Sequence, residues 1–167
     1  NFARAISNRV FYMDEGGIYE DGSPEQIFDH PQRENTRRFV RRLKVLELNI
    51  ESRDYDFLGM AGEIEAYCNK NQIVSKIKNR VQLVFEETMQ LLVPVLETPR
   101  IQAVCEYSEE TEAAKWTFCY AGQRYDVTRS DDDLAMMVLK GVADSIEYSW
   151  CEVTELGNLL AVKIRKG

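Results

Sequence analysis

The most regular apolar pattern of the chain lies at residues 73–93. Apolar side chains recur there at spacings of three and four, which predicts one long amphipathic helix. Pro94 and Pro99 end the pattern, because proline cannot continue a helix. A second helical pattern occupies residues 56–70. The apolar face of the longer helix is expected to consist of Val74, Ile77, Val81, Val84, Phe85, Thr88 and Leu92.

A different pattern, with an apolar residue at every second position, follows in residues 101–107 and 116–120. This alternation predicts two half-buried strands. The polar segment 108–114 between them is interpreted as a hairpin loop. The other elements expected after residue 44 are a strand at 45–50, a helix at about 131–145 and strands at roughly 146–153 and 158–165.

The first 44 residues carry signals for turns and helix caps. Residues 9–14 and 17–21 are predicted as two short strands, because the adjacent Gly16 and Gly17 tolerate the positive φ of a tight hairpin. Two helices are expected next: a short one that begins with the cap Ser23 and Pro24 and stops before Pro31, and one from about Glu34 to Leu43.

From residue 45 onward, the order is strand, helix, helix, strand, strand, helix, strand, strand. This order predicts an α+β two-layer sandwich, with a mostly antiparallel sheet and helices on one face. The hairpin and helices of the first segment precede it. A shift in composition at the junction predicts two domains, 1–44 and 45–167.

Composition narrows the function classes. With 44% hydrophobic and 29% charged residues the chain is typical of soluble globular proteins. No apolar run approaches the roughly 20 residues of a membrane span, so no direct membrane insertion is expected. The net charge of −7 argues against nucleic-acid binding, which usually needs a basic face. Because the first residue is Asn rather than Met, we expect the sequence to begin at a fragment boundary.

Metal chemistry is not expected. The four cysteines are scattered without a Cys-x-x-Cys pair and are interpreted as small buried hydrophobes in a reducing compartment. His30 is the single histidine and is far from any of them in sequence, so a zinc site is not predicted. The acidic triplet 131–133 is interpreted as a helix cap after Ser130, in preference to a divalent-metal site.

The first segment resembles a known family. Its motifs are the strand Val10-Phe11-Tyr12-Met13-Asp14, the run Gly22-Ser23-Pro24-Glu25-Gln26-Ile27-Phe28, the turn Asp29-His30-Pro31 and the closing Thr36-Arg37-Arg38-Phe39. In this order they resemble the end of an ABC-transporter ATPase subunit of the polar-amino-acid uptake type, over residues 1–44. The resemblance implies a parent ATPase that uses ATP and Mg²⁺ to drive amino acid import.

The same resemblance implies location and partners. The parent would be cytoplasmic, peripheral to the inner face of the cell membrane, with membrane subunits and a second ATPase subunit as partners. That family's catalytic motifs lie upstream of the matched segment, so no catalytic residue and no cofactor are expected in this chain. The apolar residues of the first strands would lack their usual sheet, so residues 1–44 are expected to dock on the second domain or to pair with another copy of the chain.

Residues 45–166 resemble a second family, the ATPase fold shared by gyrase, sensor histidine kinases and anti-sigma-factor serine kinases. The stretch Val81–Gln90 resembles its long helix, and Asp132–Tyr148 with the Gly157-Asn158 turn resembles its closing part. The resemblance places Glu86 at the general-base position. Gln90 stands where that family has a magnesium-binding Asn, and its extra methylene misplaces the amide oxygen.

Other positions depart further from that family. Tyr120 stands where its Asp would accept a bond from adenine, and Gly122 is the one glycine kept from that motif. Leu134-Ala135-Met136 replaces the glycines of the phosphate segment. We therefore predict a retained fold without ATP chemistry. Ferredoxin-like regulatory domains, found after some ABC ATPases, are the alternative fold, although they use fewer elements per copy.

Three functions follow from these resemblances. The first is a non-catalytic accessory or regulatory domain fused to an amino-acid ABC ATPase. The second is an active nucleotide-binding domain of the anti-sigma serine-kinase type. The third is a small-molecule sensor that uses a vestigial pocket, although the same residues are also typical of simple core packing. The candidate ligand-binding residues of that pocket are Glu86, Gln90, Tyr120, Gly122, Met136 and Gly157, with Met137 beside them.

Overall fold

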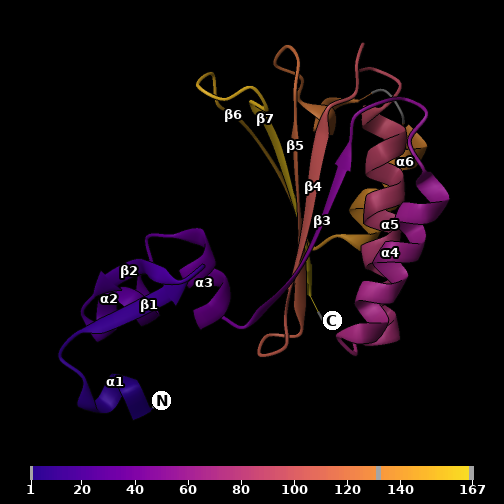
Figure 1. Ribbon diagram of the computed structural model, residues 1–167. Helices are drawn as coiled ribbons and strands as arrows, with labels where there is room; N and C mark the ends of the chain where they lie inside the picture. Colours follow the sequence, from indigo (N-terminus) through magenta and orange to yellow (C-terminus); the bar gives the residue numbers. More distant parts are fainter. Residues whose placement is uncertain (1, 131–132, 166–167) are drawn as a thin grey trace. The chain divides into compact units, whose positions relative to one another are not determined.

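The computed structural model describes residues 2–130 and 133–165 (Figure 1). The chain divides into two compact units. The first contains the residues up to Lys44 together with Ser108–Glu110, and the second contains Val45–Tyr107 and the residues from Thr111 onward. Each unit is described separately below.

The first unit consists of a hairpin and three short helices among its described residues. The predicted hairpin is confirmed, but the positive φ values of its turn lie at Glu15 (50°) and Gly16 (80°) rather than at both glycines. Ser23 and Gln26 form a reciprocal capping box at the start of the next helix, since each side chain accepts a hydrogen bond from the other's backbone N–H. The elements are α1 (Phe2–Ile6), which the sequence patterns did not predict, β1 (Val10–Asp14), β2 (Gly17–Gly22), α2 (Pro24–Asp29) and α3 (Glu34–Val40).

The third helix is shorter than expected. It ends at Val40 rather than near Leu43, because Arg42 turns the chain with a φ of 51° and Leu43 already starts the next strand. Ion pairs hold the unit's surface together, including Arg4 with Asp29 and the bidentate contact of Arg9 with Asp21.

The second unit is a two-layer α+β sandwich, which confirms the predicted fold class. Its five strands form one antiparallel sheet in the order β3-β4-β5-β7-β6, and three helices cover one face (Figure 1). Its elements are β3 (Leu43–Ile50), α4 (Phe57–Lys70), α5 (Ser75–Leu92), β4 (Ile101–Ser108), β5 (Ala113–Tyr120), the 3-10 turn η1 (Val127–Arg129), α6 (Asp133–Val142), β6 (Ser145–Trp150) and β7 (Asn158–Arg165).

The core lies between the sheet and α5. The rings of Trp116 and Phe118 on β5 stack with centroids 5.3 Å apart, and Phe85 on α5 lies 5.5 Å from Trp116. The indole Nε1 of Trp116 donates to the carbonyl of Val81 at 3.0 Å, so its polar atom is satisfied within the core. The predicted apolar face of α5 is buried except for Val74, which precedes the helix and is 39% exposed.

The last helix, α6, and the strand after it, β6, also differ in length from expectation. α6 ends at Val142 rather than near residue 145, because the N–H of Asp144 already donates to the carbonyl of Lys163 on β7 at 2.8 Å. β6 therefore starts at Ser145, and it pairs with β7 from Ser145↔Lys163 to Trp150↔Asn158. β6 is one of the two edge strands of the sheet, and β3 is the other.

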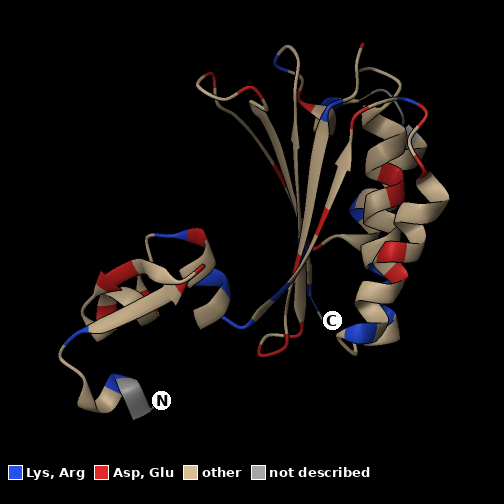
Figure 2. Ribbon diagram, in the orientation of Figure 1, with Lys and Arg blue, Asp and Glu red and all other residues tan. Residues whose placement is uncertain are grey.

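Figure 2 shows charged residues in both units, among them several on the helices α4 and α5. One of the contacts between these helices is a bond from the Lys78 ammonium of α5 to a Glu65 carboxylate oxygen of α4, at 2.9 Å. It lies at the surface, where such pairs contribute little to stability.

Candidate functional site

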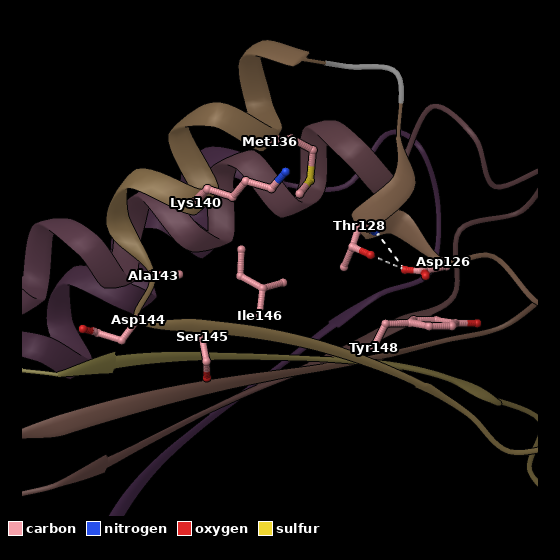
Figure 3. Close-up of a pocket in the computed structure, with 9 residues that line it drawn as sticks. All are labelled: Asp126, Thr128, Met136, Lys140, Ala143, Asp144, Ser145, Ile146 and Tyr148. Atoms are coloured by element: carbon pink, nitrogen blue, oxygen red, sulfur yellow. Dashed lines mark hydrogen bonds between the residues drawn. The ribbon is translucent and has the colours of Figure 1, made fainter.

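A shallow cavity of about 410 Å³ opens on the second unit between α6 and the edge strand β6 (Figure 3). The turn η1 and the residue before it form a third wall. This size lies within the range of about 300 to 1,000 Å³ that small-molecule sites occupy. The lining residues are Asp126, Thr128, Met136, Lys140, Ala143, Asp144, Ser145, Ile146 and Tyr148.

One carboxylate of the cavity is held by its own turn. Oδ1 of Asp126 accepts the backbone N–H of Thr128 at 3.1 Å and its hydroxyl at 2.6 Å, which caps η1. Oδ2 lies 3.3 Å from Nε of Arg129, whose side chain is 86% exposed. The side chain of Asp126 is therefore fixed in orientation while about a quarter of it, 26%, stays accessible.

A cation reaches across the cavity from α6. Figure 3 shows the Lys140 side chain extending over the hollow toward Met136 and Thr128. Within the part of the chain that the structure describes, its ammonium makes no hydrogen bond or ion pair. The methylene stem of a lysine can lie along apolar surface while the charged end stays in water. The cavity thus combines an uncommitted cation with a fixed carboxylate.

The second carboxylate, Asp144, is committed to the fold. It accepts the N–H of Arg165 and a guanidinium N–H of Arg80, both at 2.7 Å. These bonds hold the pKa of Asp144 below its usual range, with the Arg165 N–H as the larger cause. The same Arg80 also donates to the carbonyls of Val142 and Arg165 at 2.5 and 2.6 Å, so it joins α5 to the ends of α6 and β7.

Apolar groups form the floor between these charges. Met136 is almost completely buried, and Ile146 points from β6 into the hollow in Figure 3. The ring of Tyr148 lies at the end nearest η1, and its hydroxyl donates to Oδ1 of Asn158 at 2.8 Å. The aromatic ring is therefore held in place by a bond made outside the cavity.

Asn158 is the hub of a buried polar network. Its side chain is fully buried, and Oδ1 also accepts the N–H of Tyr125 at 2.8 Å. Its amide Nδ2 donates to the carbonyls of Tyr120 at 3.3 Å and Gln123 at 3.1 Å. One side chain thus ties the loop 121–125 to the strands that flank it.

Tyr120 and the glycines Gly122 and Gly157, three of the predicted pocket residues, each have a structural role in the fold. The Tyr120 ring is fully buried, its hydroxyl donates to the carbonyl of Tyr125 at 2.6 Å, and burial raises its pKa. Gly122 has a φ of 110°, which favours glycine. The carbonyl of Gly157 accepts the N–H of Cys151 at 2.8 Å, and a Cβ at Gly157 would collide with the Cys151 carbonyl oxygen.

The other predicted residues are spread over two helices. On α5, Glu86 is half-buried and Gln90 is exposed. On α6, Met136 is buried while Met137 is 65% exposed. Of the six candidate pocket residues, Met136 alone lines the cavity described here.

Metal-binding and thiol groups add little to the site. Among residues 2–130 and 133–165, no three His, Cys, Asp or Glu side chains form a group that could hold a metal ion. The acidic triplet 131–133 lies mostly outside the described residues. Cys68 and Cys105 are buried as predicted, and burial raises the pKa of Cys68 to about 11. Cys151 is instead exposed, because it lies at the end of the edge strand.

Sequence reasoning missed the polar groups that define the cavity. Asp126 and Thr128 carry a recognisable signal, since an aspartate two residues before a threonine often caps a local turn. Lys140 interrupts an otherwise apolar run in α6. The Gly157-Asn158 pair carries a turn signal in the sequence. The role of Asn158 as the centre of a network, however, depends on contacts with distant residues.

Comparisons with known proteins match a short stretch of the chain. An L-cystine import ATP-binding protein of Bacillus subtilis is 50% identical over 42 residues, which is 25% of this chain and 16% of that protein. A probable amino-acid ABC transporter ATP-binding protein of Sinorhizobium fredii is 52% identical over 40 residues, 24% of this chain and 16% of that protein. A general L-amino acid transport ATP-binding protein of Rhizobium johnstonii is 45% identical over 42 residues, with 25% and 16% covered. No protein-family model matches.

These matches support the resemblance to ATP-binding subunits of amino-acid ABC transporters over about a quarter of the chain. The matched length is close to that of the segment 1–44, which carries the motifs. The chain spans only 16 to 17% of the length of these relatives. In the described part of the chain, no helix is both long and apolar enough to cross a bilayer.

Proposed function

We propose that residues 45–167 form a non-catalytic accessory domain of an ATP-binding subunit that serves amino acid import. The observation that carries the proposal is the identity of 50% over 42 residues to a cystine import ATP-binding protein, in a chain whose larger unit is a separate five-stranded α+β sandwich. In this proposal the parent subunit hydrolyses ATP with Mg²⁺. It works with membrane subunits and a second ATPase subunit at the inner face of the cell membrane.

The non-catalytic character is supported by the loop 121–125. Asn158 and the Tyr120 hydroxyl tie this loop to the core, and the Tyr120 ring is fully buried. We propose that this unit keeps the fold of the gyrase and histidine-kinase ATPases without a nucleotide site. The order of its elements agrees with that resemblance, although agreement in order is a fold-level argument.

The proposed role is regulatory. A domain that changes the activity of an ATPase must bind differently to its conformational states. Removal of residues 45–167 from the intact subunit is therefore expected to leave basal ATP hydrolysis while changing its inhibition or its assembly with the partner subunits. The measurement is transport and ATP hydrolysis in reconstituted vesicles, with Lys70→Gln in the full-length subunit as a control for an unrelated surface change. If transport, inhibition and assembly are all unchanged, the proposal is wrong.

The alternative is an active nucleotide-binding domain. It is favoured by the position of Glu86 on α5 and by the glycine conformation kept at Gly122 after β5. Titration calorimetry with ATP or ADP and Mg²⁺ separates the two proposals. Micromolar binding that is abolished by Glu86→Ala would support the alternative and exclude the non-catalytic domain.

A further inference from the structure

The cavity between α6 and β6 has a cation on one wall and, on the opposite wall, a carboxylate whose ion-pair partner, Arg129, is 86% exposed. Exposed ion pairs of this kind are weak, so a ligand can compete for the carboxylate. Lys140 extends over it from α6, and Asp126 is fixed beside it by Thr128 (Figure 3). Asp144, the other carboxylate, is 39% exposed, but it is bound by a backbone N–H and by Arg80, which is largely buried and fixed by two further bonds. The cavity therefore offers a ligand one positive and one negative group.

The two groups restrict the charge of a ligand. A simple anion would satisfy the Lys140 ammonium but would approach the Asp126 carboxylate, and a simple cation would face the opposite conflict. Hydrogen bonds between charged groups are roughly twice as strong as neutral ones, so a ligand with both charges gains from each wall. A zwitterion with its charges close together meets this requirement.

The floor restricts the rest of the ligand. Met136 is buried, Ile146 points into the hollow and the Tyr148 ring lies beside them. No further uncommitted charge is present among the described lining residues. The apolar floor thus suits an uncharged, hydrophobic substituent, in the usual pattern of an apolar site with few orienting polar groups.

We propose that this cavity binds a free α-amino acid with an apolar side chain. The Lys140 ammonium contacts the ligand carboxylate, the Asp126 carboxylate accepts hydrogen bonds from the ligand ammonium, and Met136, Ile146 and Tyr148 contact the side chain. The regulatory meaning of this binding rests on the proposed function, because an amino acid is a natural signal for an amino acid importer.

The test uses the chain 1–167 alone, in calorimetry and in thermal unfolding. The probes are leucine, leucine methyl ester, which lacks the carboxylate charge, and N-acetyl-leucine, which lacks the ammonium. Leucine is expected to bind and to raise the unfolding temperature, because a ligand specific for the folded state stabilises it. Each derivative is expected to bind at least about tenfold more weakly.

Two variants assign the charges to their residues. Lys140→Gln should weaken leucine binding about tenfold and should remove the discrimination between leucine and its methyl ester. Asp126→Asn keeps an oxygen for the Thr128 bonds and should instead remove the discrimination against N-acetyl-leucine. The matched controls are Lys70→Gln and Asp54→Asn, at exposed positions away from the cavity, and both should bind leucine as the unmodified chain does.

The outcomes are separable. The inference would be overturned if leucine, methionine and phenylalanine at millimolar concentration gave neither a binding heat nor a shift in unfolding temperature. It would also be overturned if leucine bound both variants as tightly as the unmodified chain. Tight binding of N-acetyl-leucine would show an anion site instead. Because binding is measured without a transporter, it can succeed while the deletion of residues 45–167 has no effect on transport, or the reverse.

Discussion

The two units of this chain reach ordered structure by different means. In the described part of the first unit, two side chains, Ile27 and Thr36, are buried, while Phe11, Ile18 and Phe39 are 49 to 66% exposed. Its order comes from a hairpin turn, a capping box and surface ion pairs. The second unit has an extended apolar core around Trp116 and Phe85.

This difference shows where the stability of the chain lies. Burial of apolar surface is the dominant favourable term in folding, and exposed ion pairs contribute little. The second unit is therefore expected to unfold as a cooperative body, while the first depends on local signals. Both tryptophans, Trp116 and Trp150, belong to the second unit, so tryptophan fluorescence follows that unit alone.

The largest expected effect is loss of the central aromatic residue of the core. Trp116→Ala should lower the free energy of unfolding of the second unit by about 3 to 5 kcal/mol, because it leaves a large cavity. Denaturant titration followed by circular dichroism measures the loss. The matched change in the first unit is Phe39→Ala, at a side chain that is 66% exposed and contacts the Tyr12 ring at a centroid distance of 5.2 Å; it should cost only about 1 kcal/mol. Equal costs would contradict the contrast between the units.

A smaller loss is expected at the buried polar hub. Asn158→Ala leaves the Tyr125 N–H and the Tyr148 hydroxyl without their acceptor and should cost about 2 to 3 kcal/mol. Hydrogen exchange should also show faster opening of the loop 121–125. In the first unit, Asn35→Ala removes one part-buried bond to Asp14 and should cost no more than about 1 kcal/mol.

The helix cap of the first unit should matter locally. Ser23→Ala removes the side-chain acceptor for the Gln26 N–H and should destabilise α2 by about 1 kcal/mol. Faster hydrogen exchange confined to α2, with unchanged tryptophan fluorescence, is the expected result. Ser52→Ala, in an exposed loop, is the control. Loss of structure in the second unit would contradict the separate behaviour of the units.

The smallest expected effect is a pH dependence of the first unit. The pKa of Glu34 is lowered from 4.5 to about 2, mainly by the Arg37 guanidinium and to a smaller extent by Arg38. A lowered pKa contributes stability above the unfolded value, and that contribution is lost as the pH falls from about 4.5 to about 2. Carboxylate chemical shifts in an NMR titration measure it. Glu34→Gln should remove this component, and an unshifted Glu34 titration would contradict the ion pair.

Much of the fold could be predicted from local patterns. The three-and-four spacing in α5 and the alternation in β5 gave the right elements, because burial on one face imposes a period on the sequence. Element ends were less accurate. α3 and α6 stop early because Arg42 turns the chain and Asp144 bonds to β7, and neither contact has a periodic signal.

The residues that line the cavity could not be predicted from these local patterns. The predicted pocket residues followed a family resemblance, and of them Met136 alone lines the cavity. Asp126, Lys140 and Tyr148 belong to a turn, a helix and an edge strand, and they line one cavity only once the sheet has the strand order β5-β7-β6. Strand order depends on contacts between distant residues.

The sequence by itself determined the α+β class, the caps and turns of the first 44 residues and their likeness to ABC ATP-binding subunits, because these depend on residues close together in the chain. Tertiary structure decided which charges are free to bind. Asp144 and Asp126 are both aspartates beside short turns, and each has an arginine partner. Arg80, 64 residues from Asp144, is largely buried and held by further bonds, whereas Arg129, the partner of Asp126, is 86% exposed. Electrostatic neutralisation acts through distance in space, which no local pattern records.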